Sequence, residues 1–159
     1  MTGRGTPAMV LLTKHRITHR THPYDVAADS PNYGALVAAA IGVPPGRVFK
    51  TLIAEVDGAL TVAIVPVTGE LDLKALAAAV GGKRATLAER GAAERATGYV
   101  RGGISPLGQR KRLPTVLDDS ALEHDTVYVS AGRRGLQVEL APADLVALTD
   151  ARTAPLATG

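Results

Sequence analysis

The pattern of apolar and polar residues along the chain predicts short helices that alternate with strands. Helix starts are expected where a capping residue stands directly before a proline, as in Thr6-Pro7 and Ser30-Pro31, because proline suits the first turn of a helix. A capping box, Thr86-Leu87-Ala88-Glu89, predicts a further start. The predicted helices are Pro7 to about Lys14, Asn32–Ile41, Leu73–Val80, Thr86 to just before Gly98, and Pro142–Leu148.

Strands are predicted where apolar runs are bounded by turn residues. Asp57-Gly58 lies between two such runs, and this dipeptide is a strong signal for a tight hairpin. The loop Ala131–Gly135 joins two further runs. The predicted strands are residues 16–24, Val48–Val56, Leu60–Val67, Tyr99–Arg101, Thr115–Leu117, Thr126–Ser130 and Leu136–Leu140. Helices early in the chain and strands late favour an α/β or α+β domain with a mixed or antiparallel sheet, open or closed.

The composition narrows the class of protein without identifying a function. At 159 residues the chain is expected to form a single domain, residues 1–159, with an ordered core over about residues 6–150 and loose ends. It has no cysteine, which excludes disulfides, thiolate metal sites and a cysteine nucleophile and fits a cytoplasmic protein. No apolar stretch reaches the ~20 residues of a membrane span, and we expect no secretory signal. The net charge of +3 permits a nucleic-acid partner without requiring one.

Lys50 is the first candidate for chemistry, because it interrupts an apolar face of a predicted strand. Positions 48, 50, 52, 54 and 56 share that face, and the residues around the lysine are Val, Leu, Ala and Val. Burying a lysine there costs several kcal/mol unless it is paired or lines a cleft. The alternative is a lysine near a strand end whose stem packs on apolar surface while its charge reaches water.

The run Gly102–Pro114 is the second candidate. Gly102-Gly103 would let the backbone approach a ligand with its amides unshielded, and Arg110-Lys111-Arg112 would suit phosphate. The run is not a Walker loop, because no Gly-Lys-Ser/Thr follows. It is not a serine-hydrolase elbow either, because Pro106 lacks the N–H that such an oxyanion hole needs, and so Ser105 is a poor nucleophile candidate. Either the glycine amides stabilise an oxyanion, or the run is an ordinary turn.

Basic residues concentrate after residue 80, in Lys83-Arg84, Arg101, Arg110-Lys111-Arg112 and Arg133-Arg134. This clustering favours a rim that binds a polyanion, although a run of charges is more usually a solvated surface. His19 and His22 are close in sequence, but no third ligand lies nearby to complete a metal site. We therefore expect no metal.

Several stretches of the chain resemble the YbaK/EbsC family, the freestanding relatives of the editing domain inserted in bacterial prolyl-tRNA synthetases. The resemblance runs from Thr6 to about Asp150 in order and spacing. It implies the family fold, a mixed β-barrel-like sheet flanked by helices, and hydrolysis of Cys-tRNA(Pro) without a cofactor or metal. The stretches are Val48–Leu52, Pro66–Lys74, Thr97–Gln109 and Val129–Leu136.

The resemblance also implies roles for individual residues. The family's invariant lysine falls on Lys50, which would orient the aminoacyl group or the terminal ribose, while Gly102 and Gly103 would hold the ester carbonyl oxygen. In the mechanism proposed for the family, the thiol of the substrate's own cysteine attacks that carbonyl and the tRNA is released. The implied substrate-pocket residues are Tyr24, Tyr33, Thr51, Ser130 and Gln137. The residues implied for tRNA binding are Arg101, Arg110, Lys111, Arg112, Arg133 and Arg134.

One departure from the family pattern leaves the substrate open. Position 137 is glutamine, where aspartate is frequent in the family, and this leaves hydrolysis of Ala-tRNA(Pro) as an alternative activity. A non-catalytic module that binds tRNA or a synthetase is the other alternative, although the presence of Lys50 and Gly102-Gly103 favours an enzyme. The expected partners are the acceptor end of a mischarged tRNA and prolyl-tRNA synthetase, with no membrane association.

Overall fold

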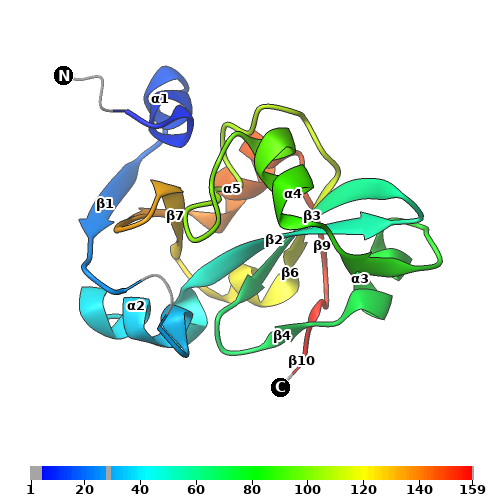
Figure 1. Cartoon of the computed structure of the whole chain (residues 1–159). Coiled ribbons are helices and arrows are strands. Elements are labelled where there is room, and N and C mark those ends of the chain that lie inside the picture. The colour runs from blue at the N-terminus through cyan, green and yellow to red at the C-terminus, as the bar shows by residue number, and fades with distance from the viewer. Residues whose placement is uncertain (1–4, 28–29, 159) are drawn as a thin grey trace.

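The computed structural model describes residues 5–27 and 30–158, and over these ranges the chain has the predicted mixed α/β fold (Figure 1). The helices are α1 (Pro7–Lys14), α2 (Tyr33–Ile41), α3 (Leu73–Ala79), α4 (Arg90–Thr97) and α5 (Pro142–Thr149), with the short 3₁₀ helices η1 (Pro45–Arg47) and η2 (Asp119–Glu123). The strands are β1 (His19–Pro23), β2 (Phe49–Val56), β3 (Ala59–Pro66), β4 (Glu70–Leu71), β5 (Ala85–Leu87), β6 (Thr115–Asp118), β7 (Val127–Arg133), β8 (Leu136–Leu140), β9 (Arg152–Ala154) and β10 (Ala157–Thr158). Within the described ranges no helix is long and apolar enough to cross a membrane.

Local capping chemistry sets two of the helix starts. At the start of α1 the Thr6 hydroxyl accepts a hydrogen bond from the Met9 N–H at 3.2 Å, and Pro7 occupies the first turn. At the start of α3 the Asp72 carboxylate accepts a hydrogen bond from the Lys74 N–H at 3.0 Å. Each cap satisfies a backbone donor that has no partner inside its helix. The predicted bounds of α1, Pro7 to about Lys14, are confirmed.

The capping signals expected at two other helix starts are wrong. α2 begins at Tyr33, after Asn32 in the left-handed conformation with φ of 56°, and Ser30-Pro31 therefore precedes the helix without capping it. Thr86 does not cap a helix, because it lies in β5 and pairs with Glu55 of β2. α4 consequently starts later in the chain than predicted. Pairing with a distant strand outweighs the local capping signal at this position.

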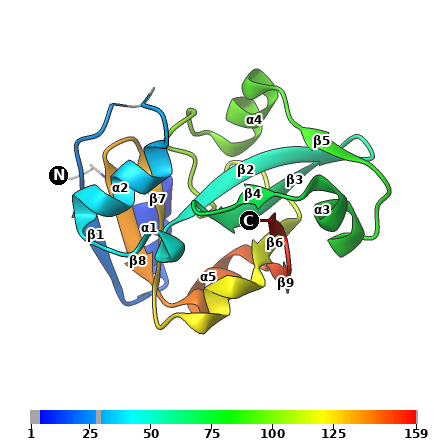
Figure 2. The ribbon, with the colours of Figure 1, turned by 90° about the horizontal axis from the view of Figure 1, so that it is seen from below.

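The strands of the described residues form three sheets, and the largest has the order β5-β2-β3-β6-β9. Its first three strands are antiparallel, whereas β6 and β9 join in parallel. An antiparallel sheet of order β1-β8-β7 lies beside it, and β10 pairs with β4. Figure 1 and Figure 2 show α2 beside the smaller of the two main sheets, and α3 and α4 beside the larger. The mixed sheet flanked by helices that the resemblance implies is confirmed, and none of these sheets closes on itself over the described residues.

The hairpin between β2 and β3 forms at the predicted turn. Asp57 and Gly58 both have positive φ, 51° and 86°, as a two-residue type I′ turn requires. Val56 and Ala59 accordingly face each other as the last pair of the hairpin. The predicted strand Tyr99–Arg101, by contrast, is wrong, because this segment leads into a tight turn.

The C-terminal residues, which we expected to be loose, are tied to the domain. β9 pairs with β6 and β10 pairs with β4. Asp118, at the end of β6, is 4% exposed and accepts hydrogen bonds from the N–H groups of Leu156 at 2.7 Å and Ala157 at 2.9 Å. The described structure therefore continues to Thr158, beyond the core predicted to end near residue 150.

β2 separates two packed cores, because successive side chains of a strand point to opposite faces. Phe49 and Ile53 belong to the larger core, which also contains residues of α1, β7, β8 and α5. Ala54 faces a second core that contains residues of α3. The same alternation sends Lys50 and Thr51 to opposite sides of the strand, next to the cavity described below.

Candidate active site

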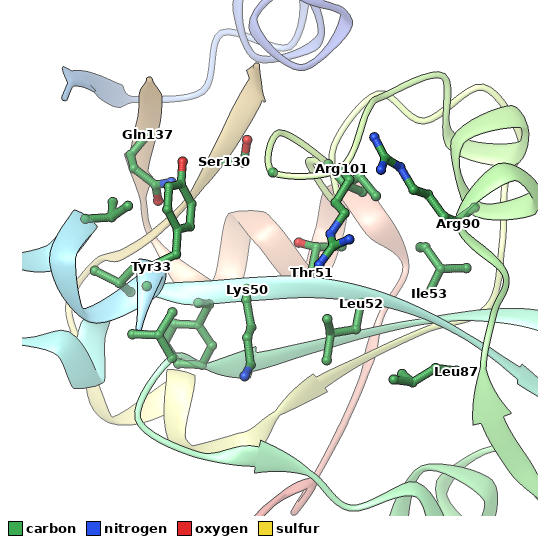
Figure 3. Close-up of a pocket in the computed structure, with 18 of the residues that line it drawn as sticks. Tyr33, Lys50, Thr51, Leu52, Ile53, Leu87, Arg90, Arg101, Ser130 and Gln137 are labelled. Atoms are coloured by element: carbon green, nitrogen blue, oxygen red, sulfur yellow. The ribbon is translucent and has the colours of Figure 1, made fainter. Parts of the chain in front are cut away.

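A cavity of about 730 Å³ lies where α2, β2, α4 and the strands β7 and β8 meet. Figure 3 shows Tyr33 and Gln137 at one end of this cavity, Arg101 beside Thr51 in the middle and Arg90 toward the other end. The predicted site residues that line the cavity are Tyr33, Lys50, Thr51, Arg101, Gly102, Ser130 and Gln137. The fold therefore brings together candidates from widely separated parts of the sequence.

Lys50 projects from β2 on the side opposite Thr51 (Figure 3), and its side chain is 33% exposed. Its Nζ lies 4.0 Å from Oε2 of Glu70 in β4, but the Glu70 side chain is 86% exposed. An ion pair that is this well solvated contributes little to stability. The ammonium group of Lys50 is therefore not held by a strong ion pair, and Lys50 is one of the residues that line the cavity.

Two buried oxygen atoms among the cavity-lining residues have no hydrogen-bond partner within the described protein, Thr51 Oγ1 and Gln137 Oε1. Gln137 is 6% exposed and pairs with Ser130 in the register between β7 and β8. Leaving a buried polar group unpaired costs about 1–3 kcal/mol. Both residues belong to the wall of the cavity, and each oxygen can accept a hydrogen bond that the described protein does not supply.

Tyr24 does not line the cavity but contacts Tyr33, which does. Their hydroxyl oxygens are 2.8 Å apart, and their rings meet edge to face. Burial, and then the hydrogen bond with Tyr24, raises the pKa of Tyr33 well above its usual range. Tyr33 therefore presents a neutral hydroxyl group at physiological pH.

The glycine pair forms a tight turn at the edge of the cavity. The Gly103 N–H donates to the Val100 carbonyl oxygen at 2.9 Å. Gly102 has φ of 89°, which the third residue of a type II turn requires, and of the two glycines it is Gly102 that lines the cavity. The prediction that both amides hold a substrate carbonyl is therefore wrong for Gly103, because its N–H closes the turn.

Packing explains why residue 103 is glycine. A Cβ at this position would lie 2.8 Å from the backbone Cα and carbonyl carbon of Arg133. Gly103→Ala is therefore expected to lower the free energy of unfolding by about 1–3 kcal/mol in urea denaturation. Gly46→Ala is the control, because a Cβ at position 46 meets nothing within 4 Å. Equal stability of the two variants would contradict this explanation.

The cations predicted to bind tRNA are divided between separate surfaces. Arg101 lines the main cavity, and Nε of Arg134 donates to the Arg101 carbonyl oxygen at 2.8 Å. Lys111 and Arg112 instead line a second cavity of about 190 Å³ together with residues of α1 and α5. Arg110, Arg133 and Arg134 are exposed and line neither cavity. The basic residues therefore do not form a single rim around the main cavity.

Sequence reasoning misses two charged residues of α4 that line the cavity, Arg90 and Glu94. Nε of Arg90 donates to Glu94 Oε2 at 3.2 Å, and the same oxygen accepts the Arg101 N–H at 2.9 Å. These hydrogen bonds, chiefly the one from Arg101, lower the pKa of Glu94. The available signal is the spacing of an arginine and a glutamate one helical turn apart inside the predicted helix, which does not by itself distinguish a site from an exposed ion pair.

The site offers a cation, hydroxyls and an amide rather than an activated protein nucleophile. Ser105 is fully buried, and its Oγ accepts a hydrogen bond from the Leu107 N–H at 3.2 Å. Ser130 lines the cavity, but its Oγ accepts a hydrogen bond from the Gly132 N–H at 3.2 Å. In the described part of the chain, no group of three or more His, Asp or Glu side chains is placed to hold a metal ion. The arrangement is suited to binding and polarising a substrate.

Comparison with known proteins gives a family and a relative that covers nearly the whole chain. Residues 33–148 match the model of the family described as "Aminoacyl-tRNA editing domain". Over 158 residues the chain is 37% identical to an Enterococcus faecalis protein named "Putative Cys-tRNA(Pro)/Cys-tRNA(Cys) deacylase EbsC". This match covers 99% of the chain and 96% of that protein.

Solved structures share the fold. One, described as "a putative trans-editing enzyme for prolyl tRNA synthetase", matches with a TM-score of 0.85 at 23% identity, over 100% of this chain and 99% of that one. A hypothetical protein matches with a TM-score of 0.84 at 25% identity, over 96% of this chain and 100% of that one. The family match and the Enterococcus faecalis relative together show that the chain belongs to the aminoacyl-tRNA editing domain family, the YbaK/EbsC family that its sequence resembles.

Proposed function

We propose that this protein is an aminoacyl-tRNA deacylase that removes cysteine from Cys-tRNA(Pro). The observation that carries the proposal is the pair of unpartnered buried oxygens, Thr51 Oγ1 and Gln137 Oε1, in the same cavity as Lys50. An aminoacyl ester supplies an amino group and ribose hydroxyls for those oxygens. The name of the Enterococcus faecalis relative supports cysteine as the amino acid.

The reaction takes its nucleophile from the substrate. The cysteine thiol loses its proton and attacks the carbonyl carbon of its own ester, and the bond from that carbon to the ribose oxygen breaks. The ribose oxygen takes up a proton as the tRNA leaves, and water then opens the cyclic thioester to give free cysteine. Lys50 orients the aminoacyl group or the terminal ribose, and the Gly102 N–H faces the negative carbonyl oxygen. One such donor typically contributes about 3 kcal/mol, and alignment of thiol and carbonyl adds to this.

Such a reaction meets a physical need. Cysteine and proline are similar in size, and a difference of about one methylene in a binding pocket is worth only about 1–3 kcal/mol. A synthetase pocket therefore gains little discrimination between them. A second, hydrolytic site removes the amino acid that the first site accepts in error.

Parallel deacylation of Cys-tRNA(Pro), Ala-tRNA(Pro) and Pro-tRNA(Pro) tests the proposal. We expect release of cysteine, with proline left in place. Faster release of alanine would favour the alternative activity that Gln137 leaves open. Release from none of the three substrates would contradict the proposal and favour a module that binds tRNA or a synthetase.

Association with prolyl-tRNA synthetase stays a prediction, which co-migration of the two purified proteins would test.

Thr51→Val tests the role of the unpaired hydroxyl. Without substrate the variant is expected to melt at the same or a higher temperature, because an unpaired buried hydroxyl is replaced by a methyl group. With substrate its KM should rise about 10-fold, which corresponds to one hydrogen bond of about 1.4 kcal/mol. The exposed Thr68, changed to valine, is the control. A lower melting temperature with an unchanged KM would instead assign the hydroxyl a structural role.

A further inference from the structure

Arg101 belongs to the glycine turn, residues Val100–Gly103, and charged side chains form hydrogen bonds with both of its backbone polar groups. Its N–H donates to Glu94 Oε2 at 2.9 Å, and its carbonyl oxygen accepts a hydrogen bond from Arg134 Nε at 2.8 Å. The hydrogen bond from the Gly103 N–H to the Val100 carbonyl oxygen closes the turn. Both polar groups of the Arg101 backbone are therefore engaged, one by α4 and the other by the loop between β7 and β8.

These contacts determine where the Gly102 N–H points. The Arg101 carbonyl and the Gly102 N–H belong to one peptide unit, and in a trans peptide these two groups point in opposite directions. Because Arg134 holds the carbonyl, the Gly102 N–H points away from Arg134. Type I and type II turns differ by a flip of this central peptide unit. The Arg134 hydrogen bond therefore favours one of two backbone arrangements of the turn.

Glycine at position 102 is what allows Arg134 to make this contact. A Cβ at position 102 would lie 2.6 Å from Arg134 Nε and 3.2 Å from its Cγ. The φ of 89° at Gly102 is also one that other residues rarely adopt. A side chain here would both strain the turn and displace the arginine.

Glu94 of α4 adds a second constraint on the turn. Its Oε2 accepts hydrogen bonds from both the Arg101 N–H and Arg90 Nε, which joins the turn to a cavity-lining residue of α4. Hydrogen bonds to an ionised carboxylate are among the stronger ones in proteins. The turn is therefore anchored to the helix as well as to the loop.

We infer that Glu94 and Arg134 are positioning residues that hold the Arg101–Gly102 peptide so that the Gly102 N–H faces the substrate's carbonyl oxygen. This inference rests on the proposed function. It gives Arg134 a role in orienting the backbone, in place of the phosphate contact that the resemblance implied. Preorganised donors lower the barrier of a reaction because they need no reorientation as charge develops.

Steady-state deacylation of Cys-tRNA(Pro) by Arg134→Ala and Arg133→Ala distinguishes an arginine that orients the backbone from one that binds phosphate. Arg134→Ala is expected to lower kcat about 10-fold or more with KM within about twofold, the signature of an interaction made in the transition state. Arg133→Ala removes an exposed cation from the same loop, and a phosphate contact there would raise KM in a salt-dependent way. A salt-dependent rise in KM with unchanged kcat for Arg134→Ala would overturn the inference.

Glu94 provides a second test through a conservative variant. Glu94→Gln keeps an oxygen that can accept the Arg101 N–H, whereas Glu94→Ala removes it. We expect kcat to stay within about threefold for Glu94→Gln and to fall about 10-fold or more for Glu94→Ala. Equal kcat values for both variants would overturn the role of Glu94. An inactive wild-type protein would contradict the proposed function itself, whereas an active wild type with an unaffected Arg134→Ala variant would contradict the positioning role alone.

The amide resonance of Gly102 gives a readout that is independent of activity. Arg134→Ala is expected to shift this resonance and to speed its hydrogen exchange, because the peptide unit loses the contact that orients it. Resonances of the Asp57-Gly58 turn, which lines neither cavity, serve as the internal control. An unchanged Gly102 resonance in a folded Arg134→Ala variant would overturn the inference.

Discussion

Replacing Lys50 with methionine is expected to lower the rate of Cys-tRNA(Pro) deacylation by about 100-fold or more, the typical effect of removing one charge-stabilising group from a preorganised site. Methionine keeps an unbranched stem but removes the cation. Arg90 and Arg101 also line the cavity, but Figure 3 shows Arg101 beside Thr51, on the side of β2 opposite to Lys50, and Arg90 farther along the cavity. Single-turnover release of labelled cysteine measures the effect.

The same substitution should leave the fold intact. The Glu70 partner of Lys50 is 86% exposed and 4.0 Å away, and the loss of such a pair changes the free energy of unfolding by at most about 1 kcal/mol. Lys74→Met on α3 is a matched control, because it removes an exposed lysine. A Lys50→Met variant that retains the wild-type rate would contradict the catalytic role. A variant that unfolds would show that Lys50 is structural instead.

Replacing Asp118 with alanine is expected to destabilise the protein by about 3 kcal/mol, because it leaves buried donors without a partner. The Asp118 carboxylate accepts hydrogen bonds from Ser120 as well as from the Leu156 and Ala157 N–H groups, and the residue is 4% exposed. The substitution therefore removes the two hydrogen bonds that tie Leu156 and Ala157 to the end of β6. Urea denaturation measures the loss, with the exposed Asp125 changed to alanine as the control. Equal stability of the two variants would contradict the anchoring role of Asp118.

The pKa of Asp118 predicts how the stability of the fold changes with pH. Burial by itself would raise its pKa, but the hydrogen bonds from Ser120, Leu156 and Ala157 outweigh this and lower it. A lowered pKa in the folded state means that the carboxylate stabilises the fold above its unfolded pKa of about 4, and that this stability is lost as the pH falls through the folded value. Asp118→Asn should therefore lose less stability than the wild type below about pH 4. An equal loss of stability in the wild type and in Asp118→Asn as the pH falls below about 4 would contradict this.

Local sequence patterns predicted those elements whose cause is local. The Asp57-Gly58 turn and the Thr6-Pro7 helix start depend on residues next to each other, and both are present. Thr86 was assigned to a helix cap because its pairing with Glu55 of β2 is a long-range contact that no local pattern reports. The hydrogen bonds of Asp118 join it to backbone amides of the distant C-terminal segment, and no local pattern indicates such contacts.

The candidate site shows the same division. The resemblance placed Lys50, Thr51 and Gln137 in one pocket, and the structure brings all three to the walls of one cavity. It could not indicate that the space beside Gly103 is occupied by the backbone of Arg133, which is distant in the sequence. The glycine pair therefore looked like an open loop for a ligand, whereas half of it is needed for packing between two loops.

The central claim is that the substrate supplies the nucleophile while the protein supplies position and charge. Single-turnover release from Cys-tRNA(Pro) and Ser-tRNA(Pro) under identical conditions tests this claim most directly. The two amino acids differ in one atom, but a thiol with a pKa of about 8.5 yields far more anion near neutral pH than a hydroxyl does. We expect release of cysteine to be at least about 100-fold faster and to rise with pH toward the pKa of the thiol. Equal rates for cysteine and serine would contradict the claim and indicate attack by water.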